Sequence, residues 1–326
     1  MRESVDAFPV RFVIVDNSGS MQTPDGSRLV KANGSLQPVQ ATRWEELGDV
    51  VREMSAVASK TGSPTHFHLL NRCQHGQFFA IADCGRSGII SAAGCTSSVE
   101  ELEVAMKASP QGSTPLTEAV QQVISQVAPA AGKLMAHGQK AVVVLCTDGR
   151  PNNPSTFLHA LQELQRLPVW VVVRLCTDSD DVVSYWSELD RQLEVPLEVL
   201  DDVTGEAREV YRKNPWLAYA PALHLARTMG LHEKLFDLMD ETRLLPSQAK
   251  RLCECVLGCA ELPEPEVEEA NFRSALAAAI GRLPPVYNPA RGQMTPWVDV
   301  DAIFGGRMTP TGGGGDAASE PGCIIS

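Results

Sequence analysis

Three oxygen-bearing side chains follow the first apolar run of the chain at alternate positions. The run over residues 12–15 is followed by Asp16, Ser18 and Ser20. A short unbroken run rich in β-branched residues is typical of a buried strand in a parallel sheet, and ligand sites in such sheets lie beyond the carboxyl ends of the strands. Carboxylate and hydroxyl oxygens suit a hard cation such as Mg²⁺. We therefore expect a cation site directly after this strand.

Two further polar residues are expected at the same edge of the sheet. Thr114 lies in a loop that opens a helix over residues 116–127, and Asp148 follows a second apolar strand over residues 141–146. These loops converge if their strands are neighbours. Two carboxylates in one pocket repel each other, and a bound divalent cation removes that repulsion. The alternative is that the hydroxyl groups only cap turns and a helix. That alternative does not explain why two acidic residues would lie next to each other.

The elements that must position these residues alternate between strand and helix. Apolar strands are expected over residues 10–15, 66–70, 77–81, 141–146, 169–173 and 196–200. Two capping boxes, Thr42 with Glu45 and Ser98 with Glu101, begin helices, whereas a polar loop is expected from the first strand to residue 41. The alternation predicts an α/β fold with a doubly wound, mostly parallel sheet and helices on both faces.

The pattern changes after this α/β region, which we place at residues 8–203. Helical patterns recur without strands over residues 206–283 and predict a small helical appendage. Residues 285–326 are rich in proline and glycine, which predicts a flexible tether.

The three polar motifs together resemble the von Willebrand factor A (VWA) domain with its metal-ion-dependent adhesion site (MIDAS). They are Asp16-x-Ser18-x-Ser20, Gly112-Ser113-Thr114-Pro115-Leu116 and Thr147-Asp148-Gly149, within residues 8–203. The resemblance implies a Rossmann-like fold and five residues that hold Mg²⁺, with Mn²⁺ or Ca²⁺ as alternatives: Asp16, Ser18, Ser20, Thr114 and Asp148. It also implies that an Asp or Glu of a protein partner completes the coordination. Proximity alone suggests a pocket rim formed by Asn17, Arg150 and Asn152.

Composition narrows the remaining classes of protein. The 326 residues include 40 acidic and 28 basic ones, so the bulk charge does not favour a nucleic-acid partner. The chain lacks the features of a signal peptide, a myristoylation site or a membrane-spanning stretch, which predicts a cytoplasmic protein. Its nine cysteines are odd in number and scattered, which indicates reduced thiols. The cysteines at 253, 255 and 259 lack a fourth ligand and are expected to be buried thiols rather than a zinc site.

The sequence Cys323-Ile324-Ile325-Ser326 fits the C-a-a-X pattern, in which a final serine favours a farnesyl group on Cys323. One lipid gives only weak, reversible membrane binding, and few basic residues lie nearby to strengthen it. We expect a protein that is cytoplasmic and partly held at the cytoplasmic face of a membrane.

Together these features predict a protein-binding module rather than an enzyme. One alternative is a substrate adaptor in a ubiquitin ligase of the copine-like kind or in a chaperone-like assembly, although the metal ligands of a RING are absent. Another is a Mg²⁺-dependent phosphatase with Asp16 as nucleophile. That chemistry resembles the haloacid-dehalogenase type, which needs a second acid where this chain has Ser18.

Overall fold

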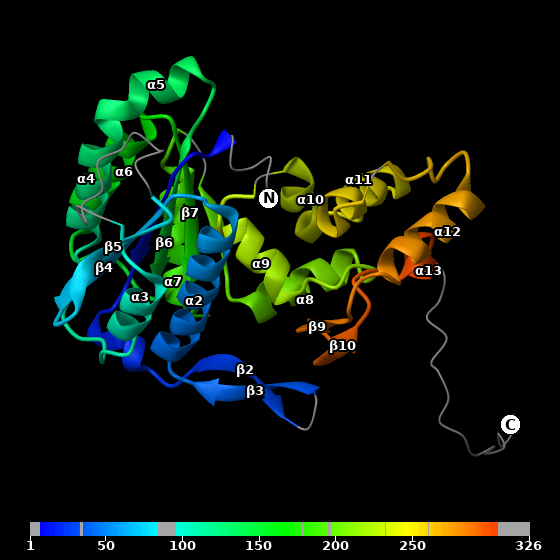
Figure 1. The fold of residues 1–326 in the computed structure, drawn as a ribbon, viewed down its shortest axis with the longest axis horizontal. Helices are drawn as coiled ribbons and strands as arrows, with labels where there is room; N and C mark the ends of the chain where they lie inside the picture. The colour runs from blue at the N-terminus through cyan, green and yellow to red at the C-terminus, as the bar shows by residue number, and fades with distance from the viewer. Residues whose placement is uncertain are drawn as a thin grey trace, which may run out of the picture.

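The computed structural model describes residues 7–32, 35–83, 96–177, 179–194, 197–231, 233–259 and 261–305. Figure 1 shows a sheet covered by helices and, beside it, a second region built mainly of helices.

A six-stranded sheet in the order β5-β4-β1-β6-β7-β8 forms the centre of the first region. Its strands are β1 (Arg11–Val15), β4 (Thr65–Cys73), β5 (Gly76–Ile81), β6 (Ala141–Thr147), β7 (Val169–Leu175) and β8 (Glu198–Leu200). β5 runs antiparallel to β4, and the other neighbours are parallel. The doubly wound, mostly parallel α/β fold expected from the sequence is confirmed. β1 and β6 are neighbours, so the segments that follow them begin at the same edge.

Helices cover both faces of this sheet, as Figure 1 shows. They are α2 (Arg43–Thr61), α3 (Val99–Met106), α4 (Leu116–Val127), α5 (Ala131–Ala136), α6 (Pro154–Gln165) and α7 (Asp180–Arg191). One apolar layer joins the sheet to α2 and α3, and the other joins it to α4, α6 and α7. Both expected capping boxes are present, with the side chains of Thr42 and Ser98 accepting hydrogen bonds from the backbone of Glu45 and Glu101.

The loop expected before α2 is instead largely an antiparallel hairpin of β2 (Gly26–Ala32) and β3 (Ser35–Ala41). Its strands are polar and Pro38 lies within β3, which weakens a strand signal in the sequence. The dipeptide Asn33-Gly34 between the two runs is the signal that could have predicted the hairpin.

The second region has an apolar core of its own. Its elements are α8 (Val203–Lys213), α9 (Pro221–Thr228), α10 (Lys234–Glu241), α11 (Pro246–Leu257), α12 (Glu269–Ile280), β9 (Val286–Asn288), β10 (Gln293–Thr295) and α13 (Val300–Ile303). Residues 286–303 were expected to belong to the tether but form β9, β10 and α13, and Val298 and Ile303 are buried in this core. β9 and β10 are only three residues long each, which leaves too weak a pattern to detect in the sequence.

Buried contacts join the two regions. Arg227 of α9 pairs with Glu198 of β8 at 2.9 Å, and within the second region it also pairs with Glu206 of α8 at 2.7 Å. Arg11 of β1 donates from Nε to the carbonyl oxygen of Met229 at 2.9 Å. Because all of these side chains are shielded from water, the contacts hold the helical region against the sheet.

The described helices are all too short or too polar to cross a lipid bilayer. Cys253 is buried and Cys259 is half-buried, as expected for thiols in a core, but Cys255 is exposed because it lies on the outer side of α11. The proposed lipidation site Cys323 lies outside the described residues.

Candidate functional site

Asp16 lies directly beyond the carboxyl end of β1 and is fully buried. Its Oδ1 accepts a hydrogen bond from the backbone N–H of Ser18 at 2.9 Å, and its Oδ2 accepts one from Thr147 Oγ1 at 2.6 Å. Burial raises the pKa of Asp16, these hydrogen bonds lower it, and the negative charge of Asp148 raises it further. The carboxyl group is therefore held in one orientation where a cation would offset the cost of its burial.

Hydroxyl groups connect the turn after β1 to the end of β6. The Oγ atoms of Ser18 and Ser20 are 3.1 Å apart, and Ser20 Oγ donates to Asp148 Oδ1 at 2.9 Å. Hydrogen bonds thus link Asp16, Ser18, Ser20 and Asp148 into one cluster, the oxygen group, in which Asp16 is joined through the backbone N–H of Ser18.

Arg43, at the start of α2, is a charged neighbour of this group that the sequence interpretation missed. Its Nη1 donates to Asp148 Oδ2 at 2.9 Å, while its Nε and Nη2 donate to the two carboxylate oxygens of Asp25 at 2.7 and 2.5 Å. Its position directly after the capping residue Thr42 gave no indication of this role, because only the fold brings the start of α2 to the end of β6.

The loop that contains Thr114 packs against both other loops. Gly19 donates from its backbone to the carbonyl oxygen of Gly112 at 3.1 Å. Thr114 and Asn152 exchange two hydrogen bonds: Thr114 N–H donates to Asn152 Oδ1 at 3.1 Å, and Asn152 N–H donates to Thr114 O at 3.2 Å. Within the described residues, no hydrogen bond joins the Thr114 hydroxyl to Asp16 or Asp148. The loop therefore lies beside the oxygen group, and in the described part of the chain the Thr114 hydroxyl makes no hydrogen bond to its two acids.

Asn71, near the carboxyl end of β4, joins the loop that follows β1 to the loop that contains Thr114. Asn17 donates from Nδ2 to Asn71 O at 2.8 Å and accepts the backbone N–H of Asn71 at 2.7 Å through Oδ1. Asn71 Nδ2 donates in turn to Ser113 O at 2.8 Å. Gly112 has φ +97°, and a Cβ atom there would lie 2.6 Å from Asn71 Oδ1, so this approach requires glycine.

The three residues suggested for the rim have different environments. Asn17 is buried and bonded to the backbone of Asn71, whereas Asn152 is exposed and bonded to Thr114. Arg150 donates to the carbonyl oxygen of Asp181 at 2.8 Å, and its guanidinium lies 5.3 Å from the centre of the Tyr185 ring. Arg150 therefore extends toward α7.

The chemistry of this oxygen group fits a hard divalent cation. It has two buried carboxylates with hydroxyl groups between them, and such oxygens are the ligands that Mg²⁺ and Mn²⁺ accept. Across the described residues, no three His, Cys, Asp or Glu side chains gather in a metal-binding arrangement, so hydroxyl ligands would be essential here.

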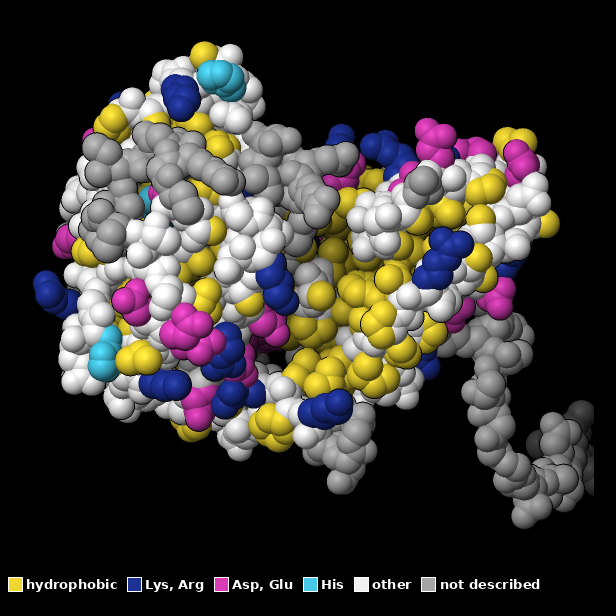
Figure 2. Space-filling model, viewed as in Figure 1, with side chains coloured by type: hydrophobic (Ala, Val, Ile, Leu, Met, Phe, Trp, Pro, Cys, Tyr) yellow, Lys and Arg dark blue, Asp and Glu magenta, His cyan; other side chains and the backbone are white. Residues whose placement is uncertain are grey.

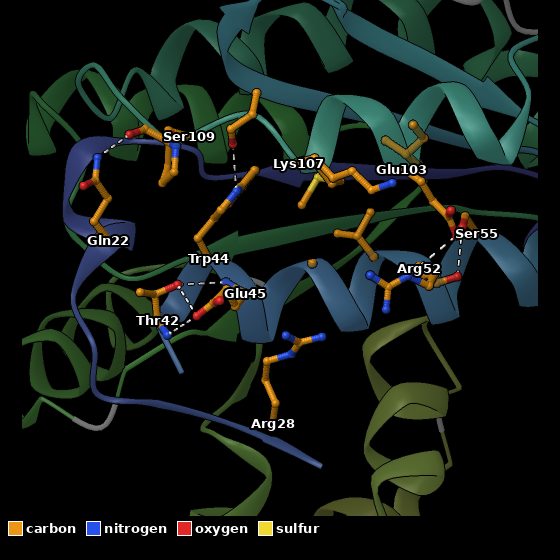
Figure 3. Close-up of a pocket in the computed structure, with 16 residues that line it drawn as sticks. Gln22, Arg28, Thr42, Trp44, Glu45, Arg52, Ser55, Glu103, Lys107 and Ser109 are labelled. Carbon is orange, nitrogen blue, oxygen red and sulfur yellow. Dashed lines mark hydrogen bonds and ion pairs between the residues drawn. The ribbon is translucent and has the colours of Figure 1, made fainter. Parts of the chain in front are cut away.

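A cavity of about 460 Å³ lies beside these loops, between α2 and α3. Figure 3 shows Trp44, Arg52, Glu103 and Lys107 along its walls. Trp44 Nε1 donates to the carbonyl oxygen of Ala108 at 3.0 Å, which holds α2 against the segment that leads to Gly112. The cavity has apolar and charged walls, and its lining ends at Pro110, two residues before Gly112.

Comparison with known proteins identifies no family. No protein-family model matches the chain, and no curated protein matches it significantly. Among solved structures, the manganese-loaded TRAP protein of Plasmodium vivax is similar over 60% of this chain and 69% of its own, at 15% identity and a TM-score of 0.36. Proximal thread matrix protein 1 from the mussel byssus is similar over 60% of this chain and 44% of its own, at 15% identity and a TM-score of 0.37. Likenesses this loose carry no argument about function, which depends on the residues described above.

Proposed function

We propose that this chain is a protein-binding module of the VWA type, in which a Mg²⁺ ion at the MIDAS-like loops accepts an acidic side chain from a partner. The observation that carries the proposal is the convergence of Asp16, Ser18, Ser20 and Asp148 at the neighbouring ends of β1 and β6. Thr114, on the adjoining loop, would complete the ligand set. Mn²⁺ or Ca²⁺ would suit the same oxygens.

The ion would supply a positive charge that a partner carboxylate can reach. Mg²⁺ keeps exchangeable waters where a protein provides too few ligands, and a carboxylate from another chain can replace one of them. Ser20 and Asn152 are exposed, which leaves the loops accessible to such a partner. The cavity between α2 and α3 lies beside the loops and offers a place for side chains next to the partner's acidic residue.

Recovery of partners from cell extracts tests the metal-bridged contact. Partners should bind the purified chain in Mg²⁺ and be lost when EDTA is added or when Asp16 is replaced by alanine. Asp237→Ala removes an exposed acid on α10 and serves as the matched control, which should bind normally. Recovery that is indifferent to EDTA and to Asp16→Ala would count against the metal-bridged contact.

We further propose that the module is cytoplasmic and that a farnesyl group on Cys323 places part of it at the cytoplasmic face of a membrane. The support is the C-a-a-X sequence at residues 323–326. In cell fractionation, Cys323→Ser should move the protein from the membrane to the soluble fraction. Cys255→Ser, at an exposed cysteine of α11, should leave the distribution unchanged. An identical distribution of the two variants would refute lipidation as the cause.

The phosphatase alternative has less support from the sequence. Chemistry of the haloacid-dehalogenase type needs a second acid two residues after the nucleophile, and this chain has Ser18 there. A role as a substrate adaptor in a ubiquitin-ligase or chaperone-like assembly is compatible with the same binding surface, and the proteins recovered with Mg²⁺ would decide it.

A further inference from the structure

A second cavity, of about 410 Å³, lies where the two regions of the chain meet. Its walls come from the β2–β3 hairpin, α2, β7, α9 and β9, and they include the apolar side chains Leu29, Val50, Leu225 and Tyr287. Figure 2 shows the surface hollowed between the sheet and the helical region, with many hydrophobic side chains around the hollow. This volume is within the range of small-molecule sites, about 300–1,000 Å³.

A chain of hydrogen bonds supports an assignment of the nitrogen of His224 that carries the proton at this cavity. Arg227 Nη1 donates to Tyr219 Oη at 3.1 Å, and a guanidinium cannot accept a hydrogen bond. Tyr219 Oη lies 3.1 Å from His224 Nδ1, and we assign the tyrosine as the donor of this hydrogen bond because its oxygen already accepts one from Arg227. Burial lowers the pKa of His224 well below its ordinary value, and the ring is therefore neutral. A neutral ring that accepts at Nδ1 carries its hydrogen on Nε2, which has no hydrogen-bond partner in the described part of the chain.

Arg174 provides a second unused donor at the same cavity. Its side chain is 2% exposed, and Nη2 is 3.3 Å from Glu46 Oε1 while Nη1 is 3.5 Å from Cys176 Sγ. Its Nε–H has no hydrogen-bond partner among the described residues. Arg174 and His224 both line this cavity, and the positive charge of Arg174 contributes to the lowered pKa of His224. A buried donor without a partner costs about 1–3 kcal/mol, so two of them beside one cavity favour a ligand that accepts hydrogen bonds.

The acidic residues around the cavity either accept hydrogen bonds from other residues of the chain or have a raised pKa. Asp49 accepts hydrogen bonds from Arg28 at 2.6 and 2.8 Å and from Arg52 at 2.6 Å. Glu46 accepts from Arg174 and from the backbone N–H of Ser27. Burial raises the pKa of the remaining acid, Glu53, which makes its charged form less favourable. Among the described residues, the polar groups at this cavity that still lack a hydrogen-bond partner are therefore mainly donors.

We propose that this cavity binds a small organic anion, in which a carboxylate or phosphate oxygen accepts hydrogen bonds from Arg174 Nε and His224 Nε2. The apolar body of the ligand packs against Leu29, Leu225 and Tyr287. Because these residues come from both regions of the chain, the ligand stabilises the junction between them. This site is separate from the MIDAS-like loops and does not depend on the proposed metal.

Octanoate and octyl phosphate, each below its micelle concentration, are suitable probes of the full chain, with octanol as the uncharged analogue. Calorimetry and thermal unfolding should show saturable binding and a rise in Tm with at least one anion and not with octanol. Binding of only one anion identifies the chemical group that the site prefers. The proposal is overturned if neither anion binds at millimolar concentration or if octanol binds as tightly as the anions.

Two pairs of variants locate the binding. His224→Leu removes the donor and should weaken binding by about 10-fold or more, whereas His224→Gln can still donate and should stay within about 3-fold of wild type. Leu29→Trp, on the hairpin, narrows the cavity without removing a buried polar group and should abolish binding. Val39→Trp is the matched change at an exposed hairpin position outside the cavity and should bind normally. Equal binding by Leu29→Trp and Val39→Trp would place the anion elsewhere and refute the site.

Discussion

Replacement of Gly112 by alanine tests whether the approach of the Thr114 loop to β4 holds the candidate metal site together. A φ of +97° is unfavourable for alanine, and the added Cβ would lie 2.6 Å from Asn71 Oδ1. The backbone conformation costs about 1–3 kcal/mol. Movement of Asn71 would also break its 2.8 Å hydrogen bond to Ser113 O, which is worth about 1 kcal/mol. The sum is a loss of roughly 2–4 kcal/mol in the free energy of unfolding.

Urea denaturation of Gly112→Ala, without and with Mg²⁺, measures this effect. We expect the loss of stability in both conditions and a smaller increase on addition of Mg²⁺, because the Thr114 loop no longer lies against Asn71. Gly132→Ala is the control, since it lies in α5 and an added Cβ would meet no atom within 4 Å. A change below about 0.5 kcal/mol in Gly112→Ala, which is the range of an ordinary surface substitution, would refute the reasoning.

Three further substitutions probe the junction, the sheet and the site. Arg227→Met leaves Glu206 buried without its partner and should lower the free energy of unfolding by about 3–5 kcal/mol in chemical denaturation; a change under 1 kcal/mol would contradict a buried ion pair. Burial lowers the pKa of His68 to about 3, so its neutral folded form loses stability relative to the unfolded chain as pH falls below the ordinary value of 6.5. In this window His68 should lower the free energy of unfolding of the wild type by up to about 1.4 kcal/mol for each unit that the pH falls, and His68→Phe should lack this decrease. Identical pH dependence of unfolding in the two proteins would argue against the effect. Arg43→Gln removes a positive charge 2.9 Å from Asp148 and should tighten Mg²⁺ binding in calorimetry, whereas unchanged or weaker binding would show that this charge does not oppose the ion.

The sequence predicts the sheet well because its central strands are unbroken apolar runs. Residues 141–146 fall within β6, and the expected helix over residues 116–127 coincides with α4. These elements are defined by local patterns that burial on both faces of a strand or on one face of a helix requires. The hairpin of β2 and β3 lacks such a pattern, because it lies outside the main sheet and its strands are polar.

The candidate site is predictable where the ligands follow strands and unpredictable where the contacts come from distant segments. Asp16 directly follows an apolar run, and Asp148 follows another after Thr147, so the order of strands is enough to bring them together. Arg43 and Asn71 reach the same loops only because α2 and β4 pack beside β1. Local sequence contains no information about such contacts, which depend on the completed fold.

Direct titration of Mg²⁺ into the full chain tests the central claim of a metal-dependent binding site. Ser20→Ala removes the hydroxyl group that donates to Asp148 from an exposed position, and Ser125→Ala removes one that donates to a backbone carbonyl on α4. We expect one saturable site in the wild type and in Ser125→Ala, with affinity reduced about 10-fold or more in Ser20→Ala. The absence of saturable binding in the wild type, or equal affinity in the two serine variants, would contradict a metal site at these loops.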